Sequence, residues 1–372
     1  MDTFLVRYSQ VDHASDAEAL IKNIYYRPER VMLLMQATRE KQEDLALIDS
    51  FGRRARKLRL SVIDKCNFRC NFCMPENPEW LPNDKVLSFE EISRLVRIFS
   101  LFGVDRIRIT GGEPLVRKEI ERLIPMILAV PGISRLGLTT NGFFLAEKAK
   151  ALKQAGLYSV TVSLHSLRSS RFSQVTRRDS HEKVLEGIRA AKEAGFESVK
   201  INAVIIRGYN DDEILDFAQF AYKYGFNMRF IEYMPFDGKK MWNTDKVVTG
   251  DESLGKIREK YEVVPLEREA GSTAMNYRFV DGGGEFGIIT SISKPFCSDC
   301  DRIRLTADGK LVPCLFDNHE YDLGHLLRSG ADDAEIASFL KSKVKLKAPG
   351  VESLIKAGSS LGHVRPMYIT GG

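Results

Sequence analysis

The sequence has little cysteine, little tryptophan and little excess charge. Its 372 residues include six cysteines and two tryptophans, and the formal net charge is +5. A charge this small suits an anionic small molecule as well as a nucleic acid, so it selects neither. No apolar run approaches the roughly 18 residues that cross a membrane. The first 20 residues are acidic and lack a basic segment followed by an apolar one, which argues against a signal or transit peptide.

The few cysteines fall into two groups of three, namely Cys66, Cys70 and Cys73, and Cys297, Cys300 and Cys314. Disulfides within either group would leave an odd thiol, unless one bridge joined the groups. Six unrelated buried thiols would be scattered along the chain. We therefore expect two metal or cluster sites in a protein of the reducing cytoplasm.

A repeated unit of strand, amphipathic helix and glycine runs through the middle of the chain. The predicted strands are Leu58–Ile63, Asp105–Thr110, Arg135–Thr139, Tyr158–Leu164, Ser198–Ile205 and Asn227–Tyr233. This alternation predicts an α/β fold with a parallel sheet and helical crossovers. Six units fall short of the eight of a closed barrel, so we expect an open, partial (βα)6 TIM-type barrel. Its site should lie at the carboxyl ends of the strands.

Helix ends are also visible in this region. Ser88 to Glu91 and Asn210 to Glu213 both have capping-box spacing. Glycines that suit left-handed helix C-caps precede later strands at Gly103, Gly156, Gly195 and Gly225.

Three segments are expected along the chain. Residues 1–48 form an N-terminal extension, with a helix over Arg30–Ile48 and no chemical role that the residues reveal. Residues 49–244 form the partial barrel. Residues 245–372 form a smaller C-terminal domain, which carries the second cysteine group and ends in a Gly-Gly tail.

The first cysteine group follows the first strand directly, on a loop at the predicted mouth of the barrel. Three thiolates on a short loop can hold three irons of a [4Fe–4S] cluster and leave the fourth iron open for a chelating ligand. Zinc is the competing interpretation, but structural zinc usually has four ligands, and no histidine lies in this loop.

The second cysteine group repeats the arrangement of three ligands. It again suggests a cluster with an open iron, and a zinc ribbon lacking one ligand is the alternative. Arg302 and Arg304 lie between its members on one face of a strand. Arginines beside a cluster suit an anionic ligand, although a solvated strand face would have the same pattern.

Three more cations, Arg59, Arg108 and Lys200, occur in strands that are otherwise apolar. A buried cation is unfavourable unless it is paired. Taken singly, each could be a charge at the rim of the sheet. Together they favour a multiply charged anion such as a triphosphate.

The stretch CNFRCNFC, residues 66–73, resembles the signature of radical S-adenosylmethionine (SAM) enzymes. In that superfamily SAM chelates the open iron, and reduction releases a 5′-deoxyadenosyl radical. Gly111-Gly112-Glu113-Pro114 follows the second strand and resembles the superfamily's GGE motif, where glycine permits close approach to the SAM amino group.

Residues from about 48 to 372 resemble the GTP 3′,8-cyclases of molybdenum-cofactor biosynthesis, the MoaA family. The matching stretches are FGRRARKLRLSVIDKCNFRCNFCMP, RIRITGGEPLVRKEI, LTTNGFFL, FIEYMP, FGIITSISKPFCSDCDRIRLTADGKLVPCLF and the terminal Gly-Gly. The arginine pair inside the second cysteine group distinguishes this family from other radical SAM enzymes.

The resemblance implies a role for each matching residue. The first cluster is held by Cys66, Cys70 and Cys73, and the second, whose open iron meets the guanine, by Cys297, Cys300 and Cys314. The SAM site is lined by Phe72, Gly112, Ser163 and Met234. The GTP contacts are Arg59, Arg108, Thr139, Lys200, Arg302, Ile303 and Arg304. The residues implied in catalysis are Arg302, Arg304, Gly371 and Gly372.

The implied reaction is that of a lyase, the conversion of GTP to (8S)-3′,8-cyclo-7,8-dihydroguanosine 5′-triphosphate. Hydrogen is abstracted from the ribose C3′, and the carbon radical attacks guanine C8. The resemblance also implies a MoaC-type cyclic pyranopterin monophosphate synthase downstream, and a reductase or flavodoxin-type electron donor. It implies no nucleic acid and no membrane partner, and it leaves a homodimer open.

Two positions depart from the family pattern. His165 stands where the family usually has Asp, and Thr370 where Ile is common. Two other functions also compete. A radical SAM peptide maturase also carries a cysteine-rich C-terminal domain. A basic, metal-bearing RNA-binding module would need interleaved aromatic and basic residues, which the sequence lacks.

Overall fold

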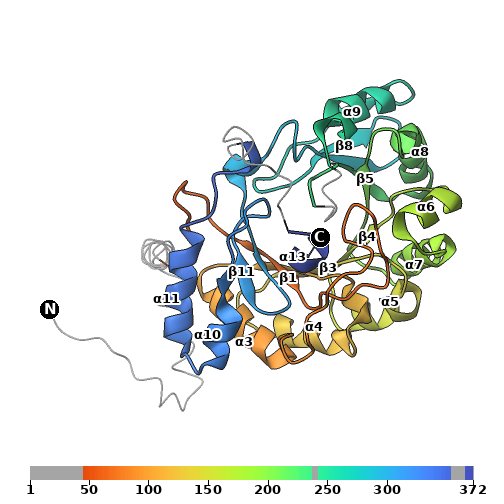
Figure 1. Ribbon diagram of the computed structural model, residues 1–372. Helices are drawn as coiled ribbons and strands as arrows, with labels where there is room; N and C mark the ends of the chain where they lie inside the picture. The colour runs from red at the N-terminus through yellow and green to blue at the C-terminus, as the bar shows by residue number, and fades with distance from the viewer. Residues whose placement is uncertain (1–44, 237–241, 353–364, 372) are drawn as a thin grey trace, which may run out of the picture. The chain divides into compact units, whose positions relative to one another are not determined.

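The computed structural model describes residues 45–236, 242–352 and 365–371 (Figure 1). The chain divides into two units, Met1–Ala46 and Leu47–Gly372. The helix expected over Arg30–Ile48 lies mostly outside the described residues. Its last four residues are described and are not helical, because Ile48 forms an isolated antiparallel bridge with Arg54.

The six strands predicted from the repeat are all present. They are β1 (Lys57–Ser61), β2 (Arg106–Thr110), β3 (Arg135–Thr140), β4 (Ser159–Ser163), β5 (Ser198–Ile205) and β6 (Asn227–Glu232). They pair side by side in chain order, and every pair is parallel. The carboxyl ends of all six strands therefore open on the same edge of the sheet.

Helices connect these strands along the outside of the sheet (Figure 1). They are α3 (Phe89–Leu101), η1 (Pro114–Val116), α4 (Ile120–Leu128), α5 (Leu145–Gln154), α6 (Ser169–Thr176), α7 (His181–Glu193), η2 (Asp211–Glu213) and α8 (Ile214–Tyr224). The capping box at Ser88 and Glu91 is confirmed. None of the helices in the described part of the chain is long and apolar enough to span a bilayer.

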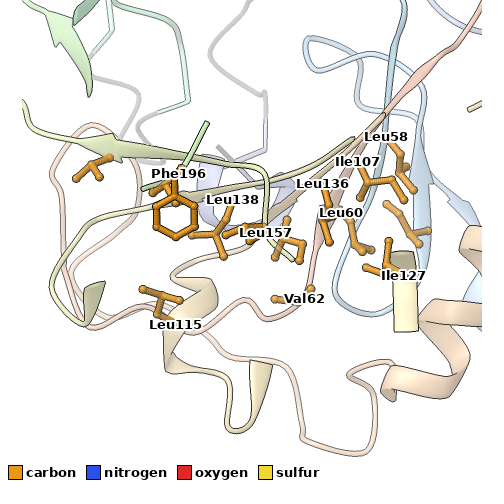
Figure 2. Packing of buried hydrophobic residues seen from close by; sticks show 14 of the residues in the cluster. Leu58, Leu60, Val62, Ile107, Leu115, Ile127, Leu136, Leu138, Leu157 and Phe196 are labelled. Carbon is orange, nitrogen blue, oxygen red and sulfur yellow. The ribbon is translucent and has the colours of Figure 1, made fainter. Parts of the chain in front are cut away.

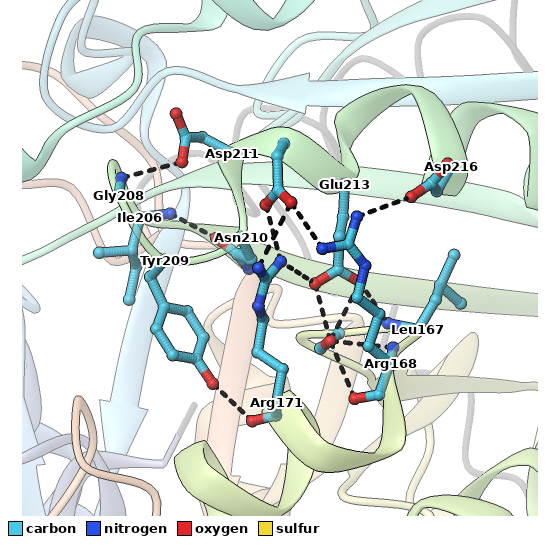
Figure 3. A network of polar contacts seen from close by, with 12 residues as sticks. Leu167, Arg168, Arg171, Ile206, Gly208, Tyr209, Asn210, Asp211, Glu213 and Asp216 are labelled. Atoms are coloured by element: carbon cyan, nitrogen blue, oxygen red, sulfur yellow. Dashed lines mark hydrogen bonds and ion pairs between the residues drawn. The ribbon is translucent and has the colours of Figure 1, made fainter.

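The capping box expected at Asn210 and Glu213 is wrong. The Asn210 side chain caps no helix; its Nδ2 donates to the carbonyl oxygens of His165 at 2.7 Å and Val204 at 2.8 Å. The Glu213 carboxylate is fully buried and accepts from the Leu167 N–H at 2.7 Å. Figure 3 shows both side chains inside one polar network. They tie the loop after β4 to the end of β5 instead of starting α8.

The remaining strands extend the same sheet at both ends. They are β7 (Val263–Pro265), β8 (Met275–Phe279), β9 (Glu285–Ile289), β10 (Arg302–Leu305), β11 (Lys310–Val312) and β12 (Tyr321–Asp322). Strand β10 pairs parallel with β1, and β9 pairs parallel with β6. The sheet order is β12-β11-β10-β1-β2-β3-β4-β5-β6-β9-β8-β7, which is consistent with an open, partial barrel.

The helical elements of this part are η3 (Thr244–Lys246), α9 (Gly250–Arg258), η4 (Cys297–Asp299), α10 (Leu323–Arg328), α11 (Asp333–Val344) and α13 (Met367–Thr370). Since strands from both sides of residue 245 share one sheet, the structure groups them in a single unit. The domain boundary at residue 245 stays a prediction.

Alternation along the strands separates the core from the site. Leu58 and Leu60 of β1 are fully buried in the core, and Figure 2 shows Leu60 near Ile127 of α4. Because successive strand residues point to opposite faces, Arg59 faces the inner side of the sheet. The inner side is therefore where the polar residues of the strands gather.

Candidate functional site

One cavity of about 290 Å³ lies on the inner side of the sheet, and all six cysteines line it. The sequence predicted two cysteine sites without placing them relative to each other. The structure brings both to the same space. Expected SAM contacts that line this cavity are Phe72, Gly112, Ser163 and Met234, and expected GTP contacts that line it are Arg59, Arg108, Thr139, Arg302 and Arg304.

The first cysteine loop folds back on itself directly after β1. The Cys70 carbonyl oxygen accepts from the N–H groups of Cys73 at 3.0 Å and Met74 at 3.1 Å, which makes a tight turn. Phe68 is buried and packs edge-on against Phe172, with ring centroids 6.0 Å apart. The loop is thus anchored by an apolar side chain between the cysteines.

Burial raises the pKa of all three thiols of this loop. The pKa of Cys66 rises to about 12 because of burial and the nearby Glu113, and the neighbouring thiols add to the effect of burial at Cys70 and Cys73. If the three cysteines bind a group as thiolates, that group must therefore supply positive charge, as iron does.

The Gly112 loop packs on the first cysteine loop at very close range. The Gly112 N–H donates to the Ile63 carbonyl oxygen at 2.7 Å. A Cβ at Gly112 would fall 2.2 Å from the Asp64 carbonyl oxygen, a distance that no side chain tolerates. Glycine is therefore required for the two loops to lie together.

Glu113 holds three elements together from a buried position. Its carboxylate accepts from the Thr140 hydroxyl at 2.7 Å, the Asn141 N–H at 2.6 Å and the Leu115 N–H at 2.9 Å. Burial raises the pKa of this carboxyl to about 7. Glu113 holds the backbone of Asn141, whose side-chain Nδ2 donates to the Cys66 sulfur at 3.8 Å and to Asn67 Oδ1 at 2.8 Å. Glu113 therefore acts on the cysteine loop through Asn141.

We expect Glu113→Ala to lower the free energy of unfolding by about 3 kcal/mol, because it leaves three donors without an acceptor, two of them in fully buried hydrogen bonds. Urea unfolding of the two proteins measures the difference. Glu121→Ala is the matched control, since Glu121 is partly exposed and pairs with Lys148 at 3.4 Å. That change should cost less than about 1 kcal/mol. Equal effects of the two substitutions would contradict the role given to Glu113.

Strand register places a row of arginines across the inner face. Arg59 of β1 is in register with Arg108 of β2 on one side and Arg304 of β10 on the other. Arg229 of β6 also lines the cavity. Burial and repulsion from the other arginines hold the pKa of Arg59 well below its usual value, and burial lowers those of Arg108, Arg229 and Arg304 to about 10. Such mutual repulsion is relieved by a multiply charged anion.

Two expected GTP contacts are placed differently from the arginines. Lys200 does not line the cavity, although burial and then Arg229 and Arg108 lower its pKa to about 7, so it lies within their electrostatic reach. The Ile303 side chain is fully buried in the core. Only the backbone of Ile303 is left to face a ligand.

The second cysteine loop is held by side chains from distant segments. Cys297 begins the turn η4 just before β10, and Cys314 follows β11. Arg53 donates to the Cys297 carbonyl oxygen at 3.0 Å, and Lys347 donates to the Cys300 carbonyl oxygen at 2.9 Å. Burial opposes ionisation of the Cys300 thiol, but Arg302 and Lys347 outweigh it and lower its pKa. Burial raises the pKa of Cys314 to about 11.

The chain end lies in the same region. Met367 of α13 lines the cavity, and Tyr368 packs edge-on against Trp80 with centroids 5.6 Å apart. The Gly371 carbonyl oxygen accepts from Arg304 Nη1. Gly372, also expected at the site, lies outside the described residues.

Both departures from the family pattern are buried near the cavity. His165 lines it, packs edge-on against Phe72 at 4.7 Å between centroids, and accepts at Nδ1 from the Val204 N–H at 3.1 Å. Burial lowers the pKa of His165 to about 4, so its ring is neutral at pH 7. Thr370 is 1% exposed, in α13.

The cysteines fit an iron–sulfur cluster by their chemistry. All six are free thiols, and each group of three faces the cavity. Over the described residues, no three His, Cys, Asp or Glu side chains converge closely enough to hold a single metal ion. A [4Fe–4S] cluster makes a different demand, because each cysteine binds a different iron and the sulfurs need not meet at one point.

Sequence reasoning missed several residues that line the cavity. Arg229 is a cation in an apolar strand, the same signal that singled out Arg59, and it could have been found. Thr161 accepts from Arg108 Nη1 at 3.0 Å, and Asn141 contacts Cys66. A threonine in a strand and an asparagine after one are too common to signal a site by themselves.

Comparisons with known families match two segments of the chain. Residues 60–221 match the profile of the radical SAM superfamily, and residues 226–353 match Molybdenum Cofactor Synthesis C. The chain is 47% identical to the GTP 3′,8-cyclase of Aquifex aeolicus over 77% of its own length and 88% of the relative. It is 41% identical to the GTP 3′,8-cyclase of Mycolicibacterium smegmatis, over 88% and 92% of the two chains.

Solved structures show a similar fold at low sequence identity. Streptococcus suis SuiB bound to S-adenosylmethionine has a TM-score of 0.59 and 15% identity, covering 96% of this chain and 88% of that one. SuiB bound to precursor peptide SuiA has a TM-score of 0.58 at 15% identity, covering 93% and 74%. At this identity the likeness concerns the fold alone.

Proposed function

The chain belongs to the GTP 3′,8-cyclase family of radical SAM enzymes, and on that premise we propose that the cavity holds SAM and GTP between two [4Fe–4S] clusters. The main observation in support is that both cysteine groups and a row of arginines line the same cavity. Two ligands bound there would lie together, which is what transfer of a hydrogen atom between them requires.

We assign the first cluster and SAM to the part of the cavity that is lined by the loops following β1 and β2. Cys66, Cys70 and Cys73 hold the cluster. Gly112 lines the cavity, where its backbone can approach the SAM amino group. Phe72 offers an aromatic face nearby. The Glu113 and Asn141 contacts keep the cysteine loop in register with these groups.

The second cluster and GTP are assigned to the side formed by β1, β2 and β10. Cys297, Cys300 and Cys314 hold the cluster that meets the guanine. Arg59, Arg108 and Arg304 lie in register across three adjacent strands and bind the triphosphate through charge-assisted hydrogen bonds. Burial lowers the pKa values of all three, and repulsion from other arginines adds to it at Arg59 and Arg304, so a bound anion would stabilise their charged forms.

The chain's own groups orient and enclose the reactants. When bound, the first cluster and SAM supply the radical that removes hydrogen from C3′ of GTP. A C3′–C8 bond then forms, and one electron and one proton complete the dihydroguanosine. Thr139, Ser163 and the half-buried α13 position the ribose and close the cavity, so that the carbon radical meets C8 before it meets solvent.

The activity implies partners before and after the reaction, and a compartment for the protein. Its product passes to a MoaC-type cyclic pyranopterin monophosphate synthase, and a reductase or flavodoxin-type protein supplies electrons. Free thiols at both cluster sites suit the reducing cytoplasm.

A peptide maturase is the second candidate, because the solved structures of SuiB share the fold. The sequence relatives and the arginine row both favour a nucleotide over a peptide. One substrate test separates the two candidates.

We expect anaerobically purified protein to contain roughly eight irons per chain, as two [4Fe–4S] clusters require. With SAM and a reductant, it should form 5′-deoxyadenosine and a cyclised nucleotide when GTP is present. Iron analysis and chromatography of the products measure both.

ATP in place of GTP is the control, because it keeps the triphosphate and replaces the guanine. Stoichiometric zinc with little iron would reject the cluster assignment. Formation of 5′-deoxyadenosine at the same rate with and without GTP would favour the peptide maturase instead.

A further inference from the structure

Lys347 lies in the segment after α11, and its side chain reaches under the second cysteine loop. The residue is 4% exposed. Its Nζ donates to the carbonyl oxygens of Cys300 and Arg302, both at 2.9 Å, and lies 3.6 Å from the Cys300 sulfur. All the capacity of an ammonium group to donate is therefore directed at one end of the loop.

The charge of Lys347 lacks an acidic partner in the part of the chain that the structure describes. Within the described residues, no carboxylate lies within ion-pairing distance of this ammonium group, whereas the neighbouring Arg53 is paired with buried Asp49 at 2.6 Å. A buried and unpaired cation is strongly unfavourable. A cluster held by three thiolates is anionic, and it would lie on the sulfur that Lys347 already contacts.

We propose that Lys347 is a positioning residue for the second cluster, which fixes the Cys300 ligand and raises the reduction potential of that cluster. This inference rests on the proposed function. Hydrogen bonds to cysteine sulfur and nearby positive charge both favour the reduced, more negative form of a cluster. The two carbonyl contacts fix where the Cys300 sulfur lies, so one side chain sets both geometry and potential.

The test is an EPR-monitored redox titration of the anaerobically reconstituted full chain, together with its iron content. It is repeated in a background where Cys66, Cys70 and Cys73 are alanine, so that only the second cluster contributes. Lys347→Gln keeps hydrogen-bond donors and removes the charge. We expect it to retain iron and to shift the midpoint potential of the second cluster to a more negative value.

Lys347→Met removes both charge and donors, and Lys347→Arg keeps both. We expect Lys347→Met to shift the potential at least as far and to lose part of the second cluster's iron, and Lys347→Arg to restore the iron and most of the potential. Lys345→Gln is the matched control, since it removes the same charge from an exposed side chain two residues away. It should leave the potential unchanged.

Parental iron content and potential in both Lys347→Gln and Lys347→Met would overturn the proposal. So would an equal shift in Lys345→Gln, because the effect would then be one of net charge. If Lys347→Gln and Lys347→Met both lose all the iron of the second cluster, Lys347→Arg decides between the outcomes. Failure of Lys347→Arg to restore that cluster overturns the proposal. Absence of a second cluster in the parent itself would reject the proposed function, a result visible before Lys347 is changed.

Discussion

Replacing Cys70 by alanine should abolish SAM cleavage and lower the iron content from roughly eight to roughly four per chain. Cys70 is the middle cysteine of the first loop. Its carbonyl oxygen also accepts from the N–H groups of Cys73 and Met74 and so closes the turn. Cys70 lines the cavity with Gly112 and Phe72, and we assign its sulfur to the cluster that SAM would chelate. Without that ligand no iron is available to chelate SAM. Anaerobic iron analysis and 5′-deoxyadenosine formation measure the result.

Cys300→Ala is the matched counterpart, because all six cysteines belong to one group or the other. We expect it to lose about the same amount of iron but to retain slow, uncoupled SAM cleavage. Cyclised nucleotide should be absent, since the cluster that we assign to the guanine is lost while the first loop is unchanged. SAM cleavage at parental rates in both variants would show that the two groups have been assigned the wrong roles.

Gly371→Ala should reduce cyclisation on the order of a hundredfold while leaving both clusters and GTP binding intact. A Cβ at Gly371 would fall 2.1 Å from the Thr110 hydroxyl oxygen, and the backbone φ is +76°. The tail must therefore move away from the end of β2, and its contact with Arg304 moves with it. A displacement of about 1 Å at the reacting ribose can produce a loss of that size.

The control for this substitution is Gly330→Ala. Gly330 has a similar φ of +91°, but a Cβ there would meet nothing within 4 Å. Both variants therefore place an alanine at a positive φ, and only one of them displaces the tail. Product formation, iron content and GTP binding should be measured for both. Near-parental cyclisation in Gly371→Ala would show that the tail does not act at the site.

The parts of the fold that the sequence predicts well are those determined by local pattern. Strand β5 has the predicted bounds, and the largest error among the six strands is two residues, at the end of β1. The Ser88 cap is also local, because its partner Glu91 is three residues away. At Asn210 the same local pattern failed. There, the Asn210 side chain bonds to His165 and the Glu213 side chain bonds to Leu167, and these tertiary contacts replace the expected capping of the helix.

The candidate site also contains some residues that the local sequence predicts and others that it does not. The cysteine groups and the cations on strands carry their own signal, and Arg229 would have been found by applying that signal once more. The contacts of Arg53 with the segment near Pro349 join residues 296 positions apart, and those of Lys347 with Cys300 join residues 47 apart. No local pattern encodes such pairs, so they follow only from the folded chain.

The order of strands in the sheet has a consequence for how the chain is made. Strands β1 to β6 span Lys57–Glu232, but their two outer edges are covered by β10 and β9, which come later in the chain. During synthesis, the six-stranded part therefore leaves the ribosome with unpaired edges on β1 and β6. Exposed edges can pair with other chains, and long-range parallel pairing forms slowly. The vulnerable interval ends only when Arg302–Leu305 has emerged and closed the edge of β1.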